Sequence, residues 1–277
     1  MNSTPALTVE GLAVEYPGRW RRPPARVIHD VSFSVDKHET LALVGESGSG
    51  KSTIGKAILG LTAATEGAIR LNGREITHLS TRGRRAIAGE LQAIFQNPYG
   101  SLNPALTIGQ SLAEPILAVR GGSAKQARAA SLEVLERVGM PGDTLDRFPG
   151  DFSGGQRQRI CIARAAVLRP SVIICDEPTS ALDVTTQAKV LELLKELQVT
   201  LGVAYLFITH DLAVVREFAH RTIVLNKGYL VEEGLTSDVC SRPRDAYTRE
   251  LLQSAPVPNP AIQRERRAQR RAAALAE

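Results

Sequence analysis

One short stretch constrains this chain more than any other feature. Residues 45–52 read G-E-S-G-S-G-K-S and fit the pattern G-x-x-x-x-G-K-[ST]. The apolar run at residues 41–44 precedes it, which predicts a buried parallel strand that leads into a helix beginning near Lys51. Glycines let the backbone turn tightly, and the start of a helix is electropositive. The stretch therefore predicts a phosphate-binding loop, with Lys51 at the β- and γ-phosphates and the Ser52 hydroxyl on Mg²⁺.

Hydrophobic patterning predicts an α/β core with a mainly parallel sheet. Alternating apolar positions and favoured turns predict antiparallel strands at residues 7–16 and 27–35 and hairpins within 68–77 and 221–233. Continuous apolar runs predict buried strands at residues 172–175 and 203–209. The expected helical segments are residues 154–168, 185–201 and 105–140, the last with breaks at Pro115 and at Gly121-Gly122.

Two adjacent acids follow the apolar run at residues 172–175. Asp176 ends this predicted strand, and Glu177 comes directly after it. The carboxyl ends of the strands are where such sheets bind ligands, so Asp176 is expected to hold Mg²⁺ through water. Two acids at a strand end could also simply begin the next loop, but the glycine loop upstream favours the functional interpretation.

A third motif, Phe152-Ser153-Gly154-Gly155-Gln156, lies between the glycine loop and the two acids. The three motifs in this order and at these separations resemble the ATP-binding cassette (ABC) ATPases, over roughly residues 7–252. The resemblance implies that Glu177 polarises the attacking water as general base. It also implies that Gln96 touches Mg²⁺ and water, that His210 contacts the γ-phosphate, and that Asp183 crosses to a partner subunit.

The adenine ring is expected to stack on an aromatic side chain. Tyr16 lies where the family keeps its stacking residue, and Trp20, in the adjoining basic loop, is the competitor. Ser153 is expected to cap a helix whose glycine-rich start forms a second anion site. One γ-phosphate does not need two such sites in one chain, so two chains are expected to pair head to tail, each donating this motif to the other's ATP.

The resemblance assigns three overlapping groups of residues. The expected catalytic residues are Glu177, His210 and Gln96, and the expected metal-binding residues are Ser52, Gln96 and Asp176. The expected nucleotide-binding residues are Tyr16, Gly45, Glu46, Ser47, Gly48, Ser49, Gly50, Lys51, Ser52, Thr53, Ser153, Gly154, Gly155, Gln156 and Asp183. The expected cofactors are ATP and Mg²⁺.

Within the family, the chain looks most like ATPases of dipeptide, oligopeptide and nickel importers. The resemblance rests on the glycine loop through Thr53, on residues 95–104 (F-Q-N-P-Y-G-S-L-N-P), on Phe148-Pro149, and on residues 246–252 (A-Y-T-R-E-L-L). Asp245-Ala246 departs from the subfamily's His-Pro at this last segment. Some members bind an iron–sulfur cluster through cysteines that follow this segment. The last cysteine of this sequence is Cys240, which precedes the segment, so no cluster is expected.

The expected fold is an α/β, P-loop NTPase (RecA-like) core with an antiparallel β subdomain and an inserted α-helical subdomain. The ATPase domain is expected at residues 7–252, with the helical subdomain at about 97–160, and a Pro-rich then basic tail at 253–277. The tail's five arginines could seek nucleic acid or anionic lipid, or could form a solvated, frayed helix, which is favoured. The three scattered cysteines favour neither a disulfide framework nor a zinc site and fit a reducing cytoplasm.

The expected function is that of an importer ATPase that hydrolyses MgATP at the cytoplasmic face of an inner membrane. No window reaches the roughly 18 apolar residues of a membrane span, and the N-terminus lacks a signal peptide. Two permease subunits are therefore expected as partners, together with a second ABC ATPase that is identical or paralogous. An extracytoplasmic substrate-binding protein is expected as an indirect partner. No nucleic acid is expected. The alternative is a non-transport ABC ATPase in DNA repair, chromosome organisation or translation, which would carry coiled-coil insertions or two cassettes.

Overall fold

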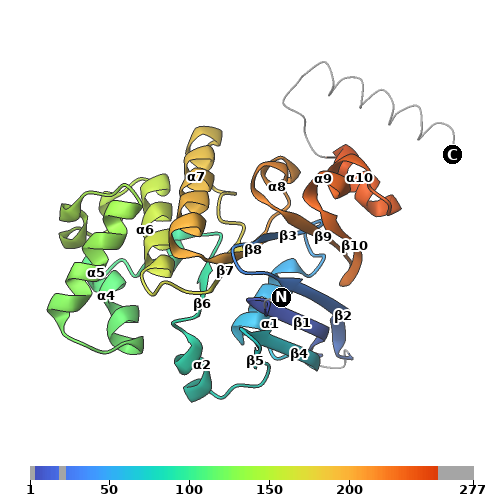
Figure 1. Cartoon of the computed structure of the whole chain (residues 1–277), viewed down its shortest axis with the longest axis horizontal. Helices are drawn as coiled ribbons and strands as arrows, with labels where there is room; N and C mark the ends of the chain where they lie inside the picture. The colour runs from blue at the N-terminus through green and yellow to red at the C-terminus, as the bar shows by residue number, and fades with distance from the viewer. Residues whose placement is uncertain (1–3, 19–22, 255–277) are drawn as a thin grey trace.

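The first part of the chain builds a four-stranded antiparallel sheet with the order β2-β1-β4-β5 (Figure 1). The computed structural model describes residues 4–18 and 23–254. The strands are β1 (Leu7–Tyr16), β2 (Ala25–Val35), β4 (Glu66–Leu71) and β5 (Arg74–Glu75). Leu7 pairs with both Val35 and Leu71, and all three side chains are buried, so one face of this sheet is apolar. The two expected strands and the hairpin at Asn72-Gly73 are confirmed.

A six-stranded sheet with the order β10-β9-β3-β8-β7-β6 forms the centre of the molecule. Its strands are β3 (Thr40–Val44), β6 (Leu91–Ile94), β7 (Val172–Asp176), β8 (Ala204–Ile208), β9 (Arg221–Asn226) and β10 (Tyr229–Leu235). The five strands from β9 to β6 are parallel, and β10 is an antiparallel edge strand. Every residue of β3 and β8 is buried, as expected for parallel strands with both faces covered. The expected α/β core is confirmed.

Helix α1 (Lys51–Leu59) lies between the two sheets (Figure 1). Its Ile54 and Ile58 share one hydrophobic cluster with Leu7 of the antiparallel sheet and with Leu43 and Leu206 of the parallel sheet. The other face of the parallel sheet is covered by α6 (Gly154–Ala166), α7 (Val184–Leu201), α8 (Leu212–Phe218), α9 (Thr236–Ser241) and α10 (Ala246–Ser254). Helix α2 (Thr81–Ile87) connects β5 to β6. The glycine loop therefore emerges between two packed layers.

A helical lobe is inserted between β6 and β7, at the end of the molecule remote from the antiparallel sheet (Figure 1). It contains α3 (Pro98–Ser101), α4 (Ile108–Val119), α5 (Ala124–Arg137), the 3-10 turns η1 (Gly142–Asp146) and η2 (Pro149–Asp151), and the beginning of α6. The expected break at Gly121-Gly122 is confirmed, since both glycines have positive φ. The expected break at Pro115 is wrong, because α4 continues through it.

The continuity of α4 at Pro115 has a physical reason. Proline removes one backbone hydrogen bond from a helix, at a cost of about 3 kcal/mol. Ile108, Leu112 and Ile116 of α4 are 0%, 0% and 5% exposed in the lobe's core. A helix start with a capping box at Thr107 and this buried stripe hold α4 together across the proline. The proline-rich stretch, the basic tail and Trp20 lie outside the described residues.

Candidate functional site

The glycine loop joins β3 to α1 and packs against the end of β9. Gly45 has φ 154°, and a Cβ there would lie 2.2 Å from the Leu225 carbonyl oxygen. Gly50 has φ 108°, and its Cβ would lie 2.6 Å from Cδ1 of Ile28. Both positions exclude a side chain, and both carry backbone angles that L residues rarely adopt. The loop path is therefore fixed by contact with the two sheets on either side of it.

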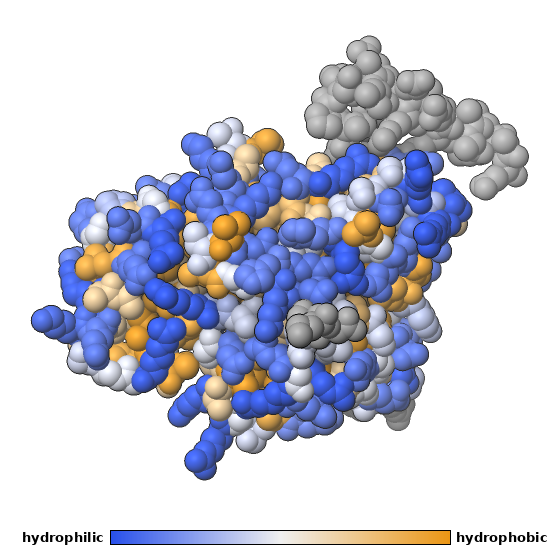
Figure 2. All heavy atoms as spheres, in the orientation of Figure 1, coloured by the Kyte–Doolittle hydropathy of each residue, from blue (hydrophilic) through white to orange (hydrophobic). Residues whose placement is uncertain are grey.

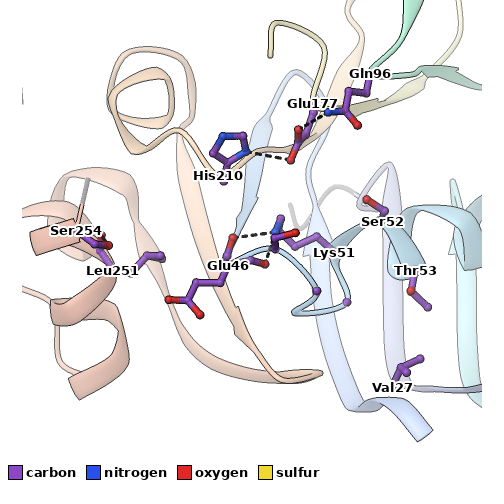
Figure 3. A pocket seen from close by; sticks show the side chains of 14 residues that line it. Val27, Glu46, Lys51, Ser52, Thr53, Gln96, Glu177, His210, Leu251 and Ser254 are labelled. Carbon is purple, nitrogen blue, oxygen red and sulfur yellow. Dashed lines mark hydrogen bonds and ion pairs between the residues drawn. The ribbon is translucent and has the colours of Figure 1, made fainter. Parts of the chain in front are cut away.

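Lys51, at the first turn of α1, is buried beneath the loop. Its Nζ donates hydrogen bonds to the carbonyl oxygens of Gly45, over 2.8 Å, and Glu46, over 2.7 Å (Figure 3). Burial lowers the pKa of Lys51, while Glu177, Asp176 and Glu46 raise it. The ammonium is held by uncharged carbonyl groups and lines the pocket. This arrangement fits an anionic ligand such as a phosphate group, which would restore the solvation that burial removes.

Ser52, which lines the pocket, is joined by a hydrogen bond to Asp176, which does not line it. The Ser52 hydroxyl donates a hydrogen bond to Oδ1 of Asp176 over 3.0 Å. Burial raises the pKa of Asp176, and the bond from Ser52 lowers it. No cluster of three or more His, Cys, Asp or Glu exists among residues 4–18 and 23–254. A hydroxyl and one carboxylate suit Mg²⁺, which is usually held by one or two protein oxygens together with phosphates and water.

Glu177 is held through both oxygens of its carboxylate. Nε2 of Gln96 donates to Oε2 over 2.9 Å, and Nδ1 of His210 lies 3.0 Å from Oε1 (Figure 3). Glu177 has φ 48°, and its N–H donates to the Ile208 carbonyl oxygen. Carboxyl ends of neighbouring parallel strands therefore deliver Glu177 from β7, His210 from β8 and Gln96 from β6 to one point. The three expected catalytic residues are brought together.

These residues line a pocket of about 680 Å³, which is in the usual size range for a small-molecule site. Its expected lining residues are Gly45, Glu46, Ser47, Gly48, Gly50, Lys51, Ser52, Thr53, Gln96, Glu177 and His210. Ser49 is buried and does not line the pocket, and its hydroxyl has no hydrogen-bond partner within the part of the chain that the structure describes. Asp176 reaches the pocket only through its bond to Ser52.

Tyr16, the expected stacking residue, lies at the end of β1 near the start of α1. Its hydroxyl oxygen is 3.4 Å from Oγ1 of Thr53, which lines the pocket. Tyr16 is 38% exposed, and it does not itself line the pocket. The hydrogen bond with Thr53 lowers the pKa of Tyr16.

The Ser153–Gln156 motif and Asp183 lie outside this pocket. Ser153 caps α6, with a reciprocal capping box in which Ser153 N–H donates to Oε1 of Gln156 over 2.9 Å. A Cβ on Gly155 would lie 2.5 Å from Cγ2 of Thr186, so this motif packs against the start of α7. Asp183 caps α7 and accepts a hydrogen bond from the Thr186 hydroxyl, which lowers the pKa of Asp183. The fold thus places the motif's glycines beside the Asp183 loop.

Three lining residues were missed by sequence reasoning: Val27 of β2 and Leu251 and Ser254 of α10. Tyr247, also of α10, was quoted only as part of a resemblance, yet its hydroxyl accepts a hydrogen bond from the Glu46 N–H over 3.0 Å. Sequence patterning gave no signal for this contact, because the two residues are 201 positions apart.

Comparison with known proteins agrees with this geometry. The ABC transporter family profile matches residues 28–180. Peptide import ATP-binding proteins of Brucella ovis and Brucella abortus are each 44% identical over 266 residues, which cover 96% of this chain and 83% of theirs. The glutathione import ATP-binding protein GsiA of Salmonella typhi is 46% identical over 271 residues, 95% of this chain but only 43% of GsiA.

Solved structures give the same result for the fold. The dimeric, post-hydrolysis structure of the ATP-binding cassette MJ0796 bound to ADP and Pi is 30% identical, with a TM-score of 0.74, and covers 83% of this chain and 98% of that one. The structure of cbiO1 from Clostridium perfringens, part of the ABC transporter complex cbiONQ, is 24% identical with a TM-score of 0.76 over 86% of this chain and 92% of that one. At this identity cbiO1 supports the fold alone. The expected P-loop NTPase fold is confirmed, and the chain belongs to the ABC transporter family as an ATP-hydrolysing, nucleotide-binding subunit.

Proposed function

We propose that the chain powers a peptide importer by hydrolysing MgATP in the pocket around Lys51, with Glu177 as general base. The observation that carries the catalytic part is the Glu177 carboxylate, which Gln96 and His210 hold at the pocket. A carboxylate held in one orientation can accept a proton from a water molecule aimed at the γ-phosphate. We expect phosphoryl transfer here to depend mainly on positioning and electrostatics.

Each pocket residue has a separate task in this proposal. Backbone N–H groups at the start of α1 and the Lys51 ammonium bind the β- and γ-phosphates. Ser52, Asp176 and Gln96 hold Mg²⁺, which neutralises phosphate charge when it is bound. His210 orients Glu177 and contacts the γ-phosphate. Tyr16 stacks on the adenine, which is supported by its 38% exposure and by its hydroxyl lying 3.4 Å from Oγ1 of Thr53.

A second ABC ATPase, identical or paralogous, completes the site. The Ser153–Gln156 motif and Asp183 lie outside the pocket of their own chain, which supports their use by a partner. The relative MJ0796 is a dimer in its solved structures. Two chains head to tail would then enclose two ATP molecules between a glycine loop from one and the motif from the other.

The membrane partners are two permeases, which dock against the helical lobe. A groove between the lobe and α1 is lined by apolar side chains that include Leu61, 65% exposed, and Phe95, 39% exposed, and by charged side chains such as Arg85. Figure 2 shows hydrophobic side chains gathered on the lower left of this face, over α4 and toward α2. No helix within residues 4–18 and 23–254 has the length and apolar character needed to cross a bilayer. We place the ATPase domain at residues 7–252, its helical subdomain at about 97–160, and the protein at the cytoplasmic face of an inner membrane.

The substrate class follows from the curated relatives, which are named as peptide or glutathione import proteins. These names favour import over the non-transport alternative. An extracytoplasmic binding protein would deliver the peptide, with no contact to this chain.

Reconstitution tests the proposal. The chain, a candidate partner ATPase and two permeases encoded by neighbouring genes would be placed in liposomes with a binding protein. We expect ATP-dependent uptake of a labelled dipeptide or oligopeptide and faster ATP hydrolysis when binding protein and peptide are both present. The chain could hydrolyse ATP while neither the hydrolysis rate nor the uptake responds to any of a panel of peptides that includes glutathione. That result would contradict the substrate class and leave the ATPase assignment intact.

A further inference from the structure

Helix α10, at the far end of the described chain, contacts the glycine loop directly. The hydroxyl of Tyr247 accepts a hydrogen bond from the backbone N–H of Glu46 over 3.0 Å. Leu251 and Ser254, one and two turns further along α10, line the nucleotide pocket opposite the loop (Figure 3). One wall of the pocket therefore comes from a helix that is distant in sequence, since Tyr247 is 201 residues after Glu46.

The start of α10 is fixed independently of the loop. Oδ1 of Asp245 accepts hydrogen bonds from the N–H groups of Tyr247, over 2.8 Å, and Thr248, over 3.4 Å. The Glu232 carboxylate, on β10, accepts from the N–H groups of Arg244 and Asp245 over 2.9 and 3.1 Å. Two carboxylates therefore set where the Tyr247 side chain begins, and its ring is partly buried.

The body of α10 is packed against the strand that delivers the loop. Leu251 and Leu252 are 8% and 9% exposed, and they share a hydrophobic cluster with Ala42 and Val44 of β3. Residue 44 is directly followed by the loop. The helix and the loop consequently share one rigid support, and the hydroxyl of Tyr247 bridges the short distance between them.

Glu46 lies at the exposed edge of the loop, and both its backbone N–H and its backbone carbonyl are hydrogen-bonded. Its carbonyl oxygen accepts from Nζ of Lys51 over 2.7 Å and from the Ser49 N–H over 3.2 Å. Its N–H is directed to Tyr247. Glu46, Ser47 and Gly48 are all exposed, so core packing does not hold this edge. The Glu46 N–H shares a peptide plane with the Gly45 carbonyl oxygen, which accepts from Nζ of Lys51 over 2.8 Å. Rotation of this Gly45–Glu46 peptide would therefore also move a carbonyl that orients the Lys51 ammonium.

We propose that Tyr247 is a positioning residue for nucleotide binding: its hydroxyl holds the Gly45–Glu46 peptide so that the loop and Lys51 stay arranged for the phosphates. This rests on the proposed role of the loop in binding MgATP. Because the loop contacts the phosphates before and during hydrolysis, the hydroxyl contributes equally to both states. Its removal should raise KM and the Kd for MgATP and leave kcat within about twofold.

Tyr247→Phe tests this in the full chain, since it removes the hydroxyl and keeps the ring. The loss of one ordinary hydrogen bond predicts a rise of about 2- to 10-fold in the Kd for MgATP. Hydrogen exchange of the segment at residues 45–47, measured in the absence of nucleotide, should also become faster. The matched control is Tyr205→Phe, whose buried hydroxyl donates to the Leu194 carbonyl oxygen over 3.0 Å, away from the loop.

The control separates positioning from general destabilisation. Tyr205→Phe should lower the melting temperature while the Kd and the exchange of residues 45–47 stay at wild-type values. Unchanged Kd and exchange in Tyr247→Phe would overturn the inference, as would an equal change of Kd in the control. If wild-type protein and Lys51→Ala both fail to bind MgATP, the proposed function fails instead. The exchange measurement still decides whether Tyr247 holds the loop in that case.

Discussion

Gln96 donates a hydrogen bond from Nε2 to Oε2 of Glu177 over 2.9 Å, and so joins the segment that leads into the helical lobe to the carboxylate that we propose as the general base. The two residues follow adjacent parallel strands, β6 and β7. Any tilt of the lobe that moves Gln96 therefore changes the hold on Glu177. This single bond offers a physical route between the lobe, where we propose that permeases dock, and the chemistry.

The first prediction concerns Glu177→Gln. The substituted amide keeps the size of the side chain but accepts a proton far less readily, while the phosphate loop is untouched. A positioned general base contributes on the order of 10²- to 10⁴-fold in rate. Turnover should therefore fall by about that factor, and the affinity for a fluorescent ATP analogue should remain close to that of the wild type.

Lys51→Ala is the matched control for that experiment. It removes the cation that faces the phosphates, so nucleotide binding itself should weaken. The two variants together separate binding from chemistry. Near-normal turnover by Glu177→Gln would remove the assignment of Glu177 as the general base.

A second prediction concerns Ser52→Ala. The Ser52 hydroxyl bonds to Asp176 over 3.0 Å, and both oxygens are proposed Mg²⁺ ligands. Loss of one ligand should raise the Mg²⁺ concentration needed for half-maximal hydrolysis by at least about 10-fold. ATP affinity measured in excess EDTA should not change, because metal-free nucleotide does not use this ligand. An unaltered Mg²⁺ requirement would contradict the metal site.

Local chemistry predicts much of this molecule. The glycine loop, the buried strands and the acids at Asp176 and Glu177 all follow from short-range patterns, because turn geometry and burial are encoded within a few residues. The resemblance to the ABC ATPases then singled out Gln96 and His210, which the fold brings to Glu177. Helical patterning predicted the helical segment of the lobe. The break predicted at Pro115 was wrong, because packing of α4 in the lobe's core offsets the cost of a proline inside a helix.

Contacts between distant segments could not be predicted. Val27, Tyr247 and Leu251 approach the loop only because β2 and α10 pack on opposite sides of it. No periodicity encodes which helix meets which loop. Leu102 gives a further example: it stands in the polar stretch at residues 95–104, but it is 3% exposed in the lobe's core.

The third prediction concerns the cysteines, all of which are free. Burial raises the pKa of Cys161 to about 11, and it raises that of Cys175, which is 0% exposed. At pH 8 only about one Cys161 thiol in a thousand would be a thiolate, the form that reacts. Cys240 is partly exposed. Maleimide labelling followed by mass spectrometry should therefore show one adduct on the native protein, at Cys240, and three after unfolding.

The fourth prediction concerns permease docking. The lobe lies between Gln96 and Ser153, both assigned to the nucleotide, so ATP binding should shift its contacts with a permease. Ser101→Cys, in a Cys240→Ser background, should cross-link to cytoplasmic permease loops with a yield that ATP changes. Ser101 suits this purpose because it is partly exposed. Val199→Cys, 83% exposed on α7, is the control that should not cross-link. Equal yields from both positions in an active transporter would argue against docking at the lobe.

The last prediction concerns the site shared between two chains. Lys51→Ala removes the phosphate cation, and Gly154→Asp places a negative charge where the motif would face the partner's γ-phosphate. A Cβ on Gly154 would lie 3.5 Å from the Tyr99 hydroxyl, an ordinary contact, so the substitution should leave the fold intact. If the chain pairs with itself, each variant alone should be inactive. In a mixed dimer, one site carries both lesions and the other carries neither.

The intact site of that mixed dimer combines Lys51 of one chain with residues 153–156 of the other, so mixing the variants should restore part of the ATPase activity. Activity in either variant alone would contradict the shared site. Wild-type protein that is inactive until a second cassette protein is added would show that the working pair is a heterodimer, and the same mixing is then done across that pair. If the mixture stays inactive, the two variant chains are linked covalently so that every dimer contains one of each. Nucleotide trapped at one site of the linked dimer means that hydrolysis needs two intact sites, whereas its absence removes the shared arrangement.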